Sequence, residues 1–195
     1  MSPLPLPLAP ASPDRSRIAD VQVLPRVVHQ DPRGSLVETL RADDAAVEGN
    51  RFVMSYTSIT LPGEFRDRDR WHLHAVQTDR FVVPVGEMLL ALFDGRKASP
   101  THGRFELLHL LAPKLAEAAS ADPHEVTTHL VTIPPGVLHC IGNRASEPFV
   151  LQNFPTERYS KADEERIPFA SLVIPDLGGP FRWGLVEGVQ EPGGG

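Results

Sequence analysis

The sequence predicts an all-β fold, a sandwich or barrel built from short antiparallel strands. Twenty prolines and 15 glycines are scattered along 195 residues, which disfavours long helices. Short apolar runs rich in β-branched residues recur between turn-forming stretches such as DPRG (31–34) and LPGE (61–64). A chain of this length can bury one sizeable core, so the strands are expected to close around a single core.

The periodic segments and their flanking turns set the expected elements. Short helices are expected at 112–125 and at 160–166, where a serine precedes a run of acids. We expect a proline-rich, solvated tail at 1–15, a single domain at 16–185 and a flexible end at 186–195. The expected strands are 21–28, 35–40, 51–59, 80–85, 87–94, 104–111, 129–134 and 148–154.

Composition excludes several kinds of partner. The formal net charge is -6 and no block of Lys and Arg occurs, so neither nucleic acid nor an anionic membrane is an expected partner. No apolar run approaches the roughly 20 residues of a membrane-spanning helix. Cys140 is the single cysteine, which precludes an internal disulfide and favours a cytoplasmic location. The expected partner is therefore a small molecule.

A pair of histidines begins the most informative stretch, RWHLHAVQTDRFVVPVG (70–86). Side chains alternate across a strand, so His72 and His74 are expected to point the same way. Four residues separate His74 from Asp79. A third histidine, His139, lies in IPPGVLHCIGN (133–143), after a tight turn expected at Pro134-x-Gly136.

These two stretches resemble the paired motifs of the cupin superfamily. The first is H-x-H, four residues, an acid, six residues and a glycine; the second is P-x-G, two residues, H, three residues and N. The resemblance implies a double-stranded β-helix, or jelly-roll barrel. In metal-binding cupins the matching positions are ligands, so the resemblance implies one divalent metal (Zn, Fe, Mn or Ni) at His72, His74, Asp79 and His139. The alternative is a polar pocket in which these histidines hydrogen-bond each other, water or a sugar.

The chain also resembles a narrower family, the dTDP-4-dehydrorhamnose 3,5-epimerases, over about residues 25 to 176. The matching blocks occur in family order. They are DPRGSLVET (31–39), VGEMLLALFDGRKASPTHGRFE (85–106), IPPGVLH (133–139) and PTERYSKADEERIPF (155–169). The resemblance implies a homodimeric, metal-free cupin that inverts carbons flanking the C4 ketone of a nucleotide-linked sugar. It implies no organic cofactor.

The resemblance assigns roles to individual residues. His74 matches the family's catalytic base, and Arg33 matches an arginine that contacts the nucleotide diphosphate. The family's lysine falls at Asp79 and its acid tyrosine at Asn153, although Tyr159 follows downstream. Its supporting aspartate falls near Ser171, and Asp176 would reach that position only in a shifted alignment. The resulting candidates are His74 and Tyr159 for catalysis, and Arg33, Glu38, Arg70, Gln77, His139 and Asn153 for substrate binding.

These features leave three hypotheses for function. The first is an epimerase or isomerase of a nucleotide-linked keto-sugar, used in polysaccharide or secondary-metabolite synthesis. The second is a metal-dependent cupin enzyme, either a dioxygenase or an isomerase of small sugars. The third is a non-catalytic sugar-binding cupin, since the lysine, tyrosine and aspartate of the family pattern are replaced. The length of the resemblance favours the first hypothesis.

Overall fold

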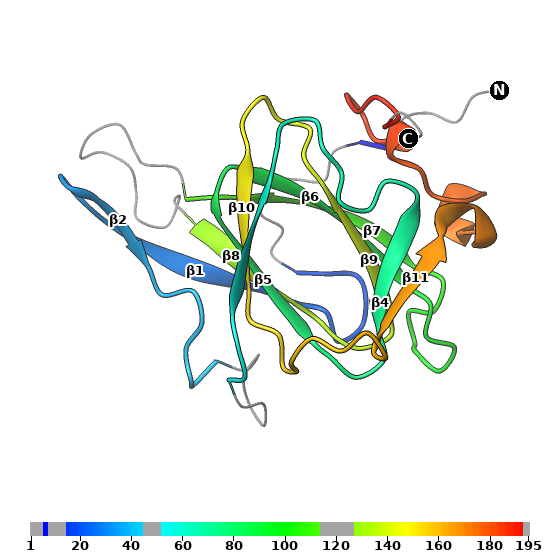
Figure 1. Ribbon diagram of the computed structural model, residues 1–195, viewed down its shortest axis with the longest axis horizontal. Coiled ribbons are helices and arrows are strands. Elements are labelled where there is room, and N and C mark those ends of the chain that lie inside the picture. Colours follow the sequence, from blue (N-terminus) through cyan, green and yellow to red (C-terminus); the bar gives the residue numbers. More distant parts are fainter. Residues whose placement is uncertain (1–5, 8–14, 45–51, 114–126, 193–195) are drawn as a thin grey trace.

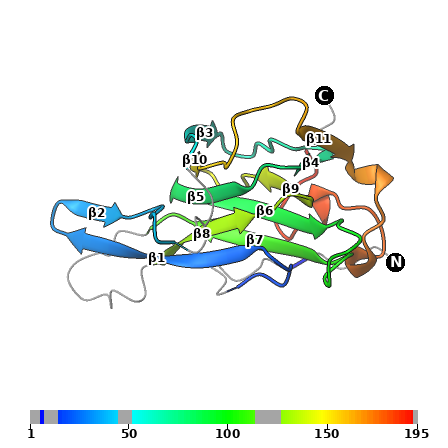
Figure 2. The ribbon, with the colours of Figure 1, turned by 90° about the horizontal axis from the view of Figure 1, so that it is seen from below.

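Two antiparallel sheets make up almost all of the regular structure (Figure 1). The computed structural model describes residues 6–7, 15–44, 52–113 and 127–192. Seen from below, the sheets lie against one another as two curled layers (Figure 2). The predicted all-β jelly roll is confirmed.

The first sheet has six strands in the order β2-β1-β8-β5-β10-β3. Strands β1 and β2 form a hairpin that projects from the body in both views (Figures 1 and 2). The strands are β1 (Gln22–Asp31), β2 (Gly34–Val37), β3 (Tyr56–Thr60), β5 (Asp79–Val85), β8 (Thr127–Ile133) and β10 (Phe149–Asn153).

The second sheet has five strands in the order β11-β4-β9-β6-β7. Strand β4 lies between β11 and β9. It pairs with β11 along its whole length and with β9 at the single register pair His72–His139. The strands are β4 (Arg70–His74), β6 (Glu87–Asp94), β7 (Phe105–Leu111), β9 (Val137–Gly142) and β11 (Glu164–Pro168).

The main hydrophobic core fills the space between the sheets. Alternate residues of facing strands supply it, among them Phe81 and Val83 of β5 and Leu90 and Leu92 of β6. This period of two follows from the strand pleat, because every second side chain points inward. The polar site described below lies in the same inter-sheet space, beside Phe81.

A second core covers the outer face of the five-stranded sheet. Trp71 and Trp183 are fully buried there, and Phe181 lies within 5.2 Å of both ring systems. The covering segment contains the short 3₁₀ helices Phe169–Ser171, Pro175–Leu177 and Trp183–Leu185. Strand β4 is therefore held from outside by packed aromatics, which fixes the inward-facing histidines.

Glycine is required at the turn between β5 and β6. Gly86 has a φ of 80°, and an added Cβ would lie 2.8 Å from the Cα of Phe149. This glycine ends the first cupin-like motif. Because Gly86 has no side chain, β10 can pass close to the turn.

The structure corrects one predicted element. The helix predicted at 160–166 is wrong: 160–163 forms a turn, closed by the Asp163 N–H donating to the Ser160 carbonyl at 3.0 Å, and strand β11 follows. Pairing with β4 supplies more hydrogen bonds than one isolated helical turn. The helix predicted at 112–125 lies mostly outside the described residues. No helix in the described ranges is long and apolar enough to cross a membrane.

Candidate functional site

A cavity of about 230 Å³ lies between the two sheets. Both sheets contribute to its wall, and the segment between β3 and β4 adds Arg66 and Asp67. Three of the residues named by the cupin-like motifs line it, namely His72, Asp79 and His139. The other lining residues are Tyr56, Ser58, Phe81, Ile141, Leu151 and Arg166.

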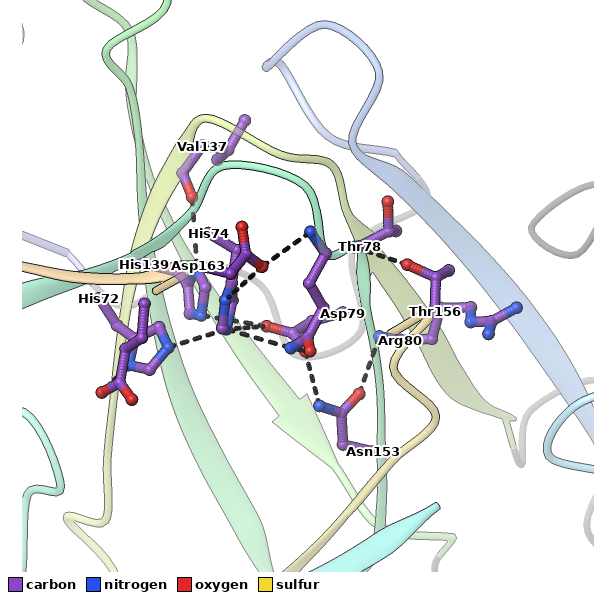
Figure 3. Close-up of polar contacts among 12 residues, drawn as sticks. His72, His74, Thr78, Asp79, Arg80, Val137, His139, Asn153, Thr156 and Asp163 are labelled. Atoms are coloured by element: carbon purple, nitrogen blue, oxygen red, sulfur yellow. Dashed lines mark hydrogen bonds and ion pairs between the residues drawn. The ribbon is translucent and has the colours of Figure 1, made fainter. Parts of the chain in front are cut away.

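The histidines come from neighbouring strands of the five-stranded sheet. His72 and His74 point the same way, as their spacing predicts, with their Nε2 atoms 2.9 Å apart. The ring of His139 on β9 lies 5.1 Å from that of His72, because these two residues are register partners. Figure 3 shows the three imidazoles gathered beside Asp79.

Asp79 faces the histidines from the opposite sheet and connects the polar groups. Its Oδ2 lies 3.6 Å from His74 Nε2 and 3.5 Å from His139 Nε2. Its Oδ1 accepts hydrogen bonds from the side-chain amides of Gln77 (2.8 Å) and Asn153 (2.7 Å). Burial raises the pKa of the Asp79 carboxyl, although these donors act in the other direction.

The Gln77 amide fixes the tautomer of His74. This nitrogen donates to Asp79 and also lies 3.1 Å from His74 Nε2. An amide nitrogen cannot accept a hydrogen bond, so His74 Nε2 must be the acceptor and carries a lone pair. The proton of neutral His74 is therefore on Nδ1, and His72 is the donor in the contact between the two histidines.

Asp163 lies behind His74, at the other ring nitrogen. Its Oδ2 is 3.3 Å from His74 Nδ1, within ion-pair distance but outside hydrogen-bond geometry. The backbone N–H groups of Ala75, Val76 and Gln77 all donate to this carboxylate. Burial alone would raise the pKa of Asp163, but these donors lower it overall. The carboxylate is thus ionised and fixed where it faces the Nδ1 proton.

His72 and His139 stay neutral at physiological pH. Burial, together with the nearby imidazoles, lowers the pKa of His72 to about 3 and that of His139 to about 4. The pocket therefore presents uncharged rings, whose nitrogens act as hydrogen-bond donors or acceptors.

The side chains contact one another directly in their present arrangement. His72 and His74 meet nitrogen to nitrogen, and Gln77 donates to the same His74 atom. Within the described ranges, no group of three or more His, Cys, Asp or Glu residues is arranged to hold a metal. The arrangement is the hydrogen-bonded polar pocket, and metal binding by His72, His74, Asp79 and His139 stays an untested prediction.

The other predicted site residues separate into two groups. Gln77, His139 and Asn153 are buried in the cluster, as the predictions require. Tyr159 is 70% exposed, and Arg33, Glu38 and Arg70 lie at the surface. Arg33 pairs with Asp31 in the projecting hairpin, and Arg70 pairs with its neighbour Asp69. The structure does not bring these four residues into the histidine cluster.

Sequence reasoning missed several groups at the site. Tyr56, Arg66, Asp67 and Arg166 line the cavity, and Asp163 lies behind His74. The shifted alignment to Asp176 fails, because this carboxylate instead accepts a hydrogen bond from the Phe105 N–H at 3.0 Å. The pairing of β11 with β4 brings Asp163 to His74, and no motif predicts that pairing.

Asp67 has an unusual environment for a carboxylate. It is 7% exposed, and Arg166 approaches its Oδ1 only to 3.4 Å. Burial outweighs that cation and raises the pKa of Asp67 to about 6. Asp67 therefore titrates closer to neutrality than an ordinary carboxyl.

Comparison with known proteins identifies relatives along most of the chain. The probable low-salt glycan biosynthesis epimerase Agl13 of Haloferax volcanii is 35% identical over 155 residues, covering 78% of this chain and 88% of that protein. The spore coat polysaccharide biosynthesis protein SpsL of Bacillus subtilis is 28% identical over 168 residues, covering 85% and 96%. A solved dTDP sugar isomerase from Desulfovibrio desulfuricans superposes with a TM-score of 0.65 at 25% identity, covering 81% and 90%. No protein-family model matches the chain.

The two curled sheets and the polar cluster between them define a cupin. Within that class, the chain belongs to the sugar-nucleotide epimerases of the dTDP-4-dehydrorhamnose 3,5-epimerase type. The resemblance seen in the sequence is thereby confirmed.

Proposed function

We propose that this chain inverts a carbon beside the ketone of a nucleotide-linked keto-sugar, with His74 as the base. The observation that carries the proposal is the state of His74. Its Nε2 carries a lone pair directed into the inter-sheet cluster, where it accepts from His72 and Gln77, and the ionised Asp163 faces its Nδ1 proton. A ketone acidifies the neighbouring C–H bond, and a neutral imidazole held in one tautomer suits its removal.

Ligand binding must rearrange one contact. His74 Nε2 at present accepts from His72 and Gln77, and His72 is the one that lines the cavity. A substrate carbon reaches His74 only where it replaces the His72 contact. We therefore assign His72 to the substrate-binding wall.

Cations near the cavity can stabilise the negative charge that forms on the ketone oxygen. The family pattern has a lysine where this chain has Asp79, and an aspartate cannot supply a positive charge. Arg66 and Arg166 both line the cavity. We assign them this electrostatic role, since a fixed cation in a partly dehydrated site favours a developing oxyanion.

The projecting hairpin supports a role for a second subunit. Arg33 lies near its tip with an exposed side chain, and Val27 and Leu36 are 63% and 60% exposed on the same hairpin. We propose that the protein is a homodimer in which this apolar surface is covered. Arg33 and Glu38 would then contact the nucleotide of the bound sugar. We also propose the cytoplasm as the location and 16–185 as the catalytic domain.

Solvent exchange tests the proposal directly. The protein is incubated with dTDP-4-keto-6-deoxyglucose in D₂O, and the sugar is examined by NMR. The expected result is deuterium at a carbon flanking the ketone, together with a new diastereomer. If neither forms while the sugar nucleotide binds, the protein is the non-catalytic binder of the third hypothesis.

The metal-dependent alternative has its own measurement. Metal content is determined for the purified protein and for a variant carrying both His72→Ala and His139→Ala. Near-stoichiometric metal that is lost in the variant, together with oxygen uptake, would favour the metal-dependent enzyme. Exchange that survives removal of metal by a chelator would favour the epimerase.

A further inference from the structure

Tyr56 contributes a hydroxyl to the cavity from the sheet opposite the histidines. It begins β3, at the edge of the six-stranded sheet, and is the register partner of Asn153 on β10. Its hydroxyl oxygen lies 3.0 Å from the Asn153 side-chain nitrogen, and its side chain lines the cavity. Tyr56 is 43% exposed, so a ligand in the cavity can reach it.

The hydrogen bonds of Asn153 determine where the Tyr56 proton points. The backbone N–H of Arg80 donates to Asn153 Oδ1 at 2.9 Å, which fixes that atom as the oxygen. The side-chain nitrogen then donates one proton to Asp79 and the other to Tyr56. The Tyr56 oxygen therefore accepts. Its own proton is used in no other hydrogen bond found among the described residues, so it is free for a group in the cavity.

The two sheets place Tyr56 and the histidines on opposite walls. Tyr56 belongs to the six-stranded sheet, whereas His72 and His74 come from β4 of the five-stranded sheet. A sugar ring held between the sheets presents one face to each wall. Inversion at carbon needs this geometry, because the proton leaves from one face and returns to the other.

We propose that Tyr56 is the catalytic acid that protonates the sugar carbon on the face away from His74, and that Asn153 positions it. This inference rests on the proposed function. His74 Nε2 takes the proton as the C–H bond breaks, which leaves an enolate. The Tyr56 O–H bond then breaks as its proton forms the new C–H bond, and the ketone is restored. The phenolate regains a proton from water and the His74 imidazolium loses one to water, so no cofactor is consumed.

The environment of Tyr56 is consistent with an acid that stays protonated until it is needed. Burial, followed by the charge of Asp79, raises the pKa of Tyr56 above its usual value. The chain has two tyrosines, and the other, Tyr159, is 70% exposed. Glu164 is the hydrogen-bond partner of Tyr159. Tyr56 is thus the tyrosine whose hydroxyl belongs to the cavity wall.

Separating exchange from inversion tests this assignment. Wild type and Tyr56→Phe are compared with dTDP-4-keto-6-deoxyglucose in D₂O, and deuterium uptake and configuration are read from the same sample. Without the acid, His74 can return a deuteron only to the face it deprotonated. We expect Tyr56→Phe to keep deuterium uptake with retained configuration, and to lose inversion by about 10²-fold or more. Persisting uptake also demonstrates that the variant is folded.

Control variants distinguish the possible failures. Thr57→Val changes the neighbouring exposed residue of β3 and is expected to leave both readouts unchanged. Inversion by Tyr56→Phe at the wild-type rate would overturn the inference and leave the proposed function standing. Loss of inversion in Tyr159→Phe, with Tyr56→Phe unaffected, would overturn it in the same way. Absence of uptake in the wild type would refute the proposed function and this inference together.

Discussion

The histidine cluster and the β1–β2 hairpin use carboxylates in opposite ways. In the cluster, Asp79 is 3% exposed, and its hydrogen-bond partner Asn153 is 74 positions away in the chain. In the hairpin, the Asp31 side chain is 44% exposed and pairs with Arg33, two positions away. Burying a polar group without a partner is costly, so losing a hydrogen bond in the cluster should destabilise the fold. The Asp31–Arg33 pair is exposed, so water can replace either partner at little cost. Substitutions in the cluster should therefore alter chemistry and stability, and those in the hairpin should alter only binding.

Removing His74 should give the largest effect. His74→Gln deletes the proposed base but keeps a polar side chain of similar length. We expect the rate of deuterium uptake by the sugar to fall by about 10³- to 10⁴-fold, with little change in binding of dTDP. His102→Gln, an exposed histidine outside the cluster, should behave as wild type. A His74→Gln variant that still exchanges normally would remove the base assignment.

Neutralising Asp163 should give the next largest effect. Asp163→Asn can keep an acceptor for the backbone N–H groups but removes the charge facing His74 Nδ1. The imidazole then loses the group that favours its reactive tautomer, and uptake should fall about 10²-fold or more. Glu165→Gln, an exposed acid two positions further along the chain in β11, is the matched control. Equal rates in the two variants would show that Asp163 only caps the 75–77 turn.

Asp67 should make stability depend on pH. Its folded pKa of about 6 lies above the unfolded value, so the folded protein binds an extra proton between about pH 4 and pH 6. The contribution of Asp67 to the free energy of unfolding therefore falls by about 2–3 kcal/mol as the pH rises through that window. Asp67→Asn should lack this fall when urea unfolding is measured from pH 4 to pH 7. Asp69→Asn, in the same loop but exposed, should not reproduce the effect.

The hairpin should give the smallest effect. Arg33→Ala removes an exposed ion pair, so the midpoint of thermal unfolding should stay unchanged. If Arg33 contacts the diphosphate, the KM for the sugar nucleotide should rise roughly tenfold with kcat preserved. Arg104→Ala, an exposed arginine outside the hairpin that also pairs with an aspartate, serves as the control. A large loss of stability in Arg33→Ala would contradict the contrast between the two regions.

The difference between the regions also explains which site residues were predictable. His72, His74, Asp79 and His139 belong to motifs of fixed spacing, and a strand's period of two aims such residues at one face. Tyr56 belongs to no motif, and Asp163 lies in the family-like block 155–169 but has no role at the histidines in that pattern. They reach the cluster through the β3–β10 and β11–β4 pairings, which depend on contacts between distant segments. Tyr159 is a predicted catalytic residue because it follows downstream of Asn153, where the family's acid tyrosine falls, but its side chain is 70% exposed and is not part of the cavity wall.

The sequence by itself determined the all-β class, most of the strands and the two histidine motifs. These features are local, since turns, pleat periodicity and motif spacing all act within a few residues. Only the tertiary structure decided that the histidines hydrogen-bond each other, that Asp163 lies behind His74, and that Tyr56 faces the cavity with a free proton. Those relations join residues up to 97 positions apart, as in Asn153 and Tyr56. Such pairs meet only when the sheets close around a common core, and no pattern within a single strand encodes that closure.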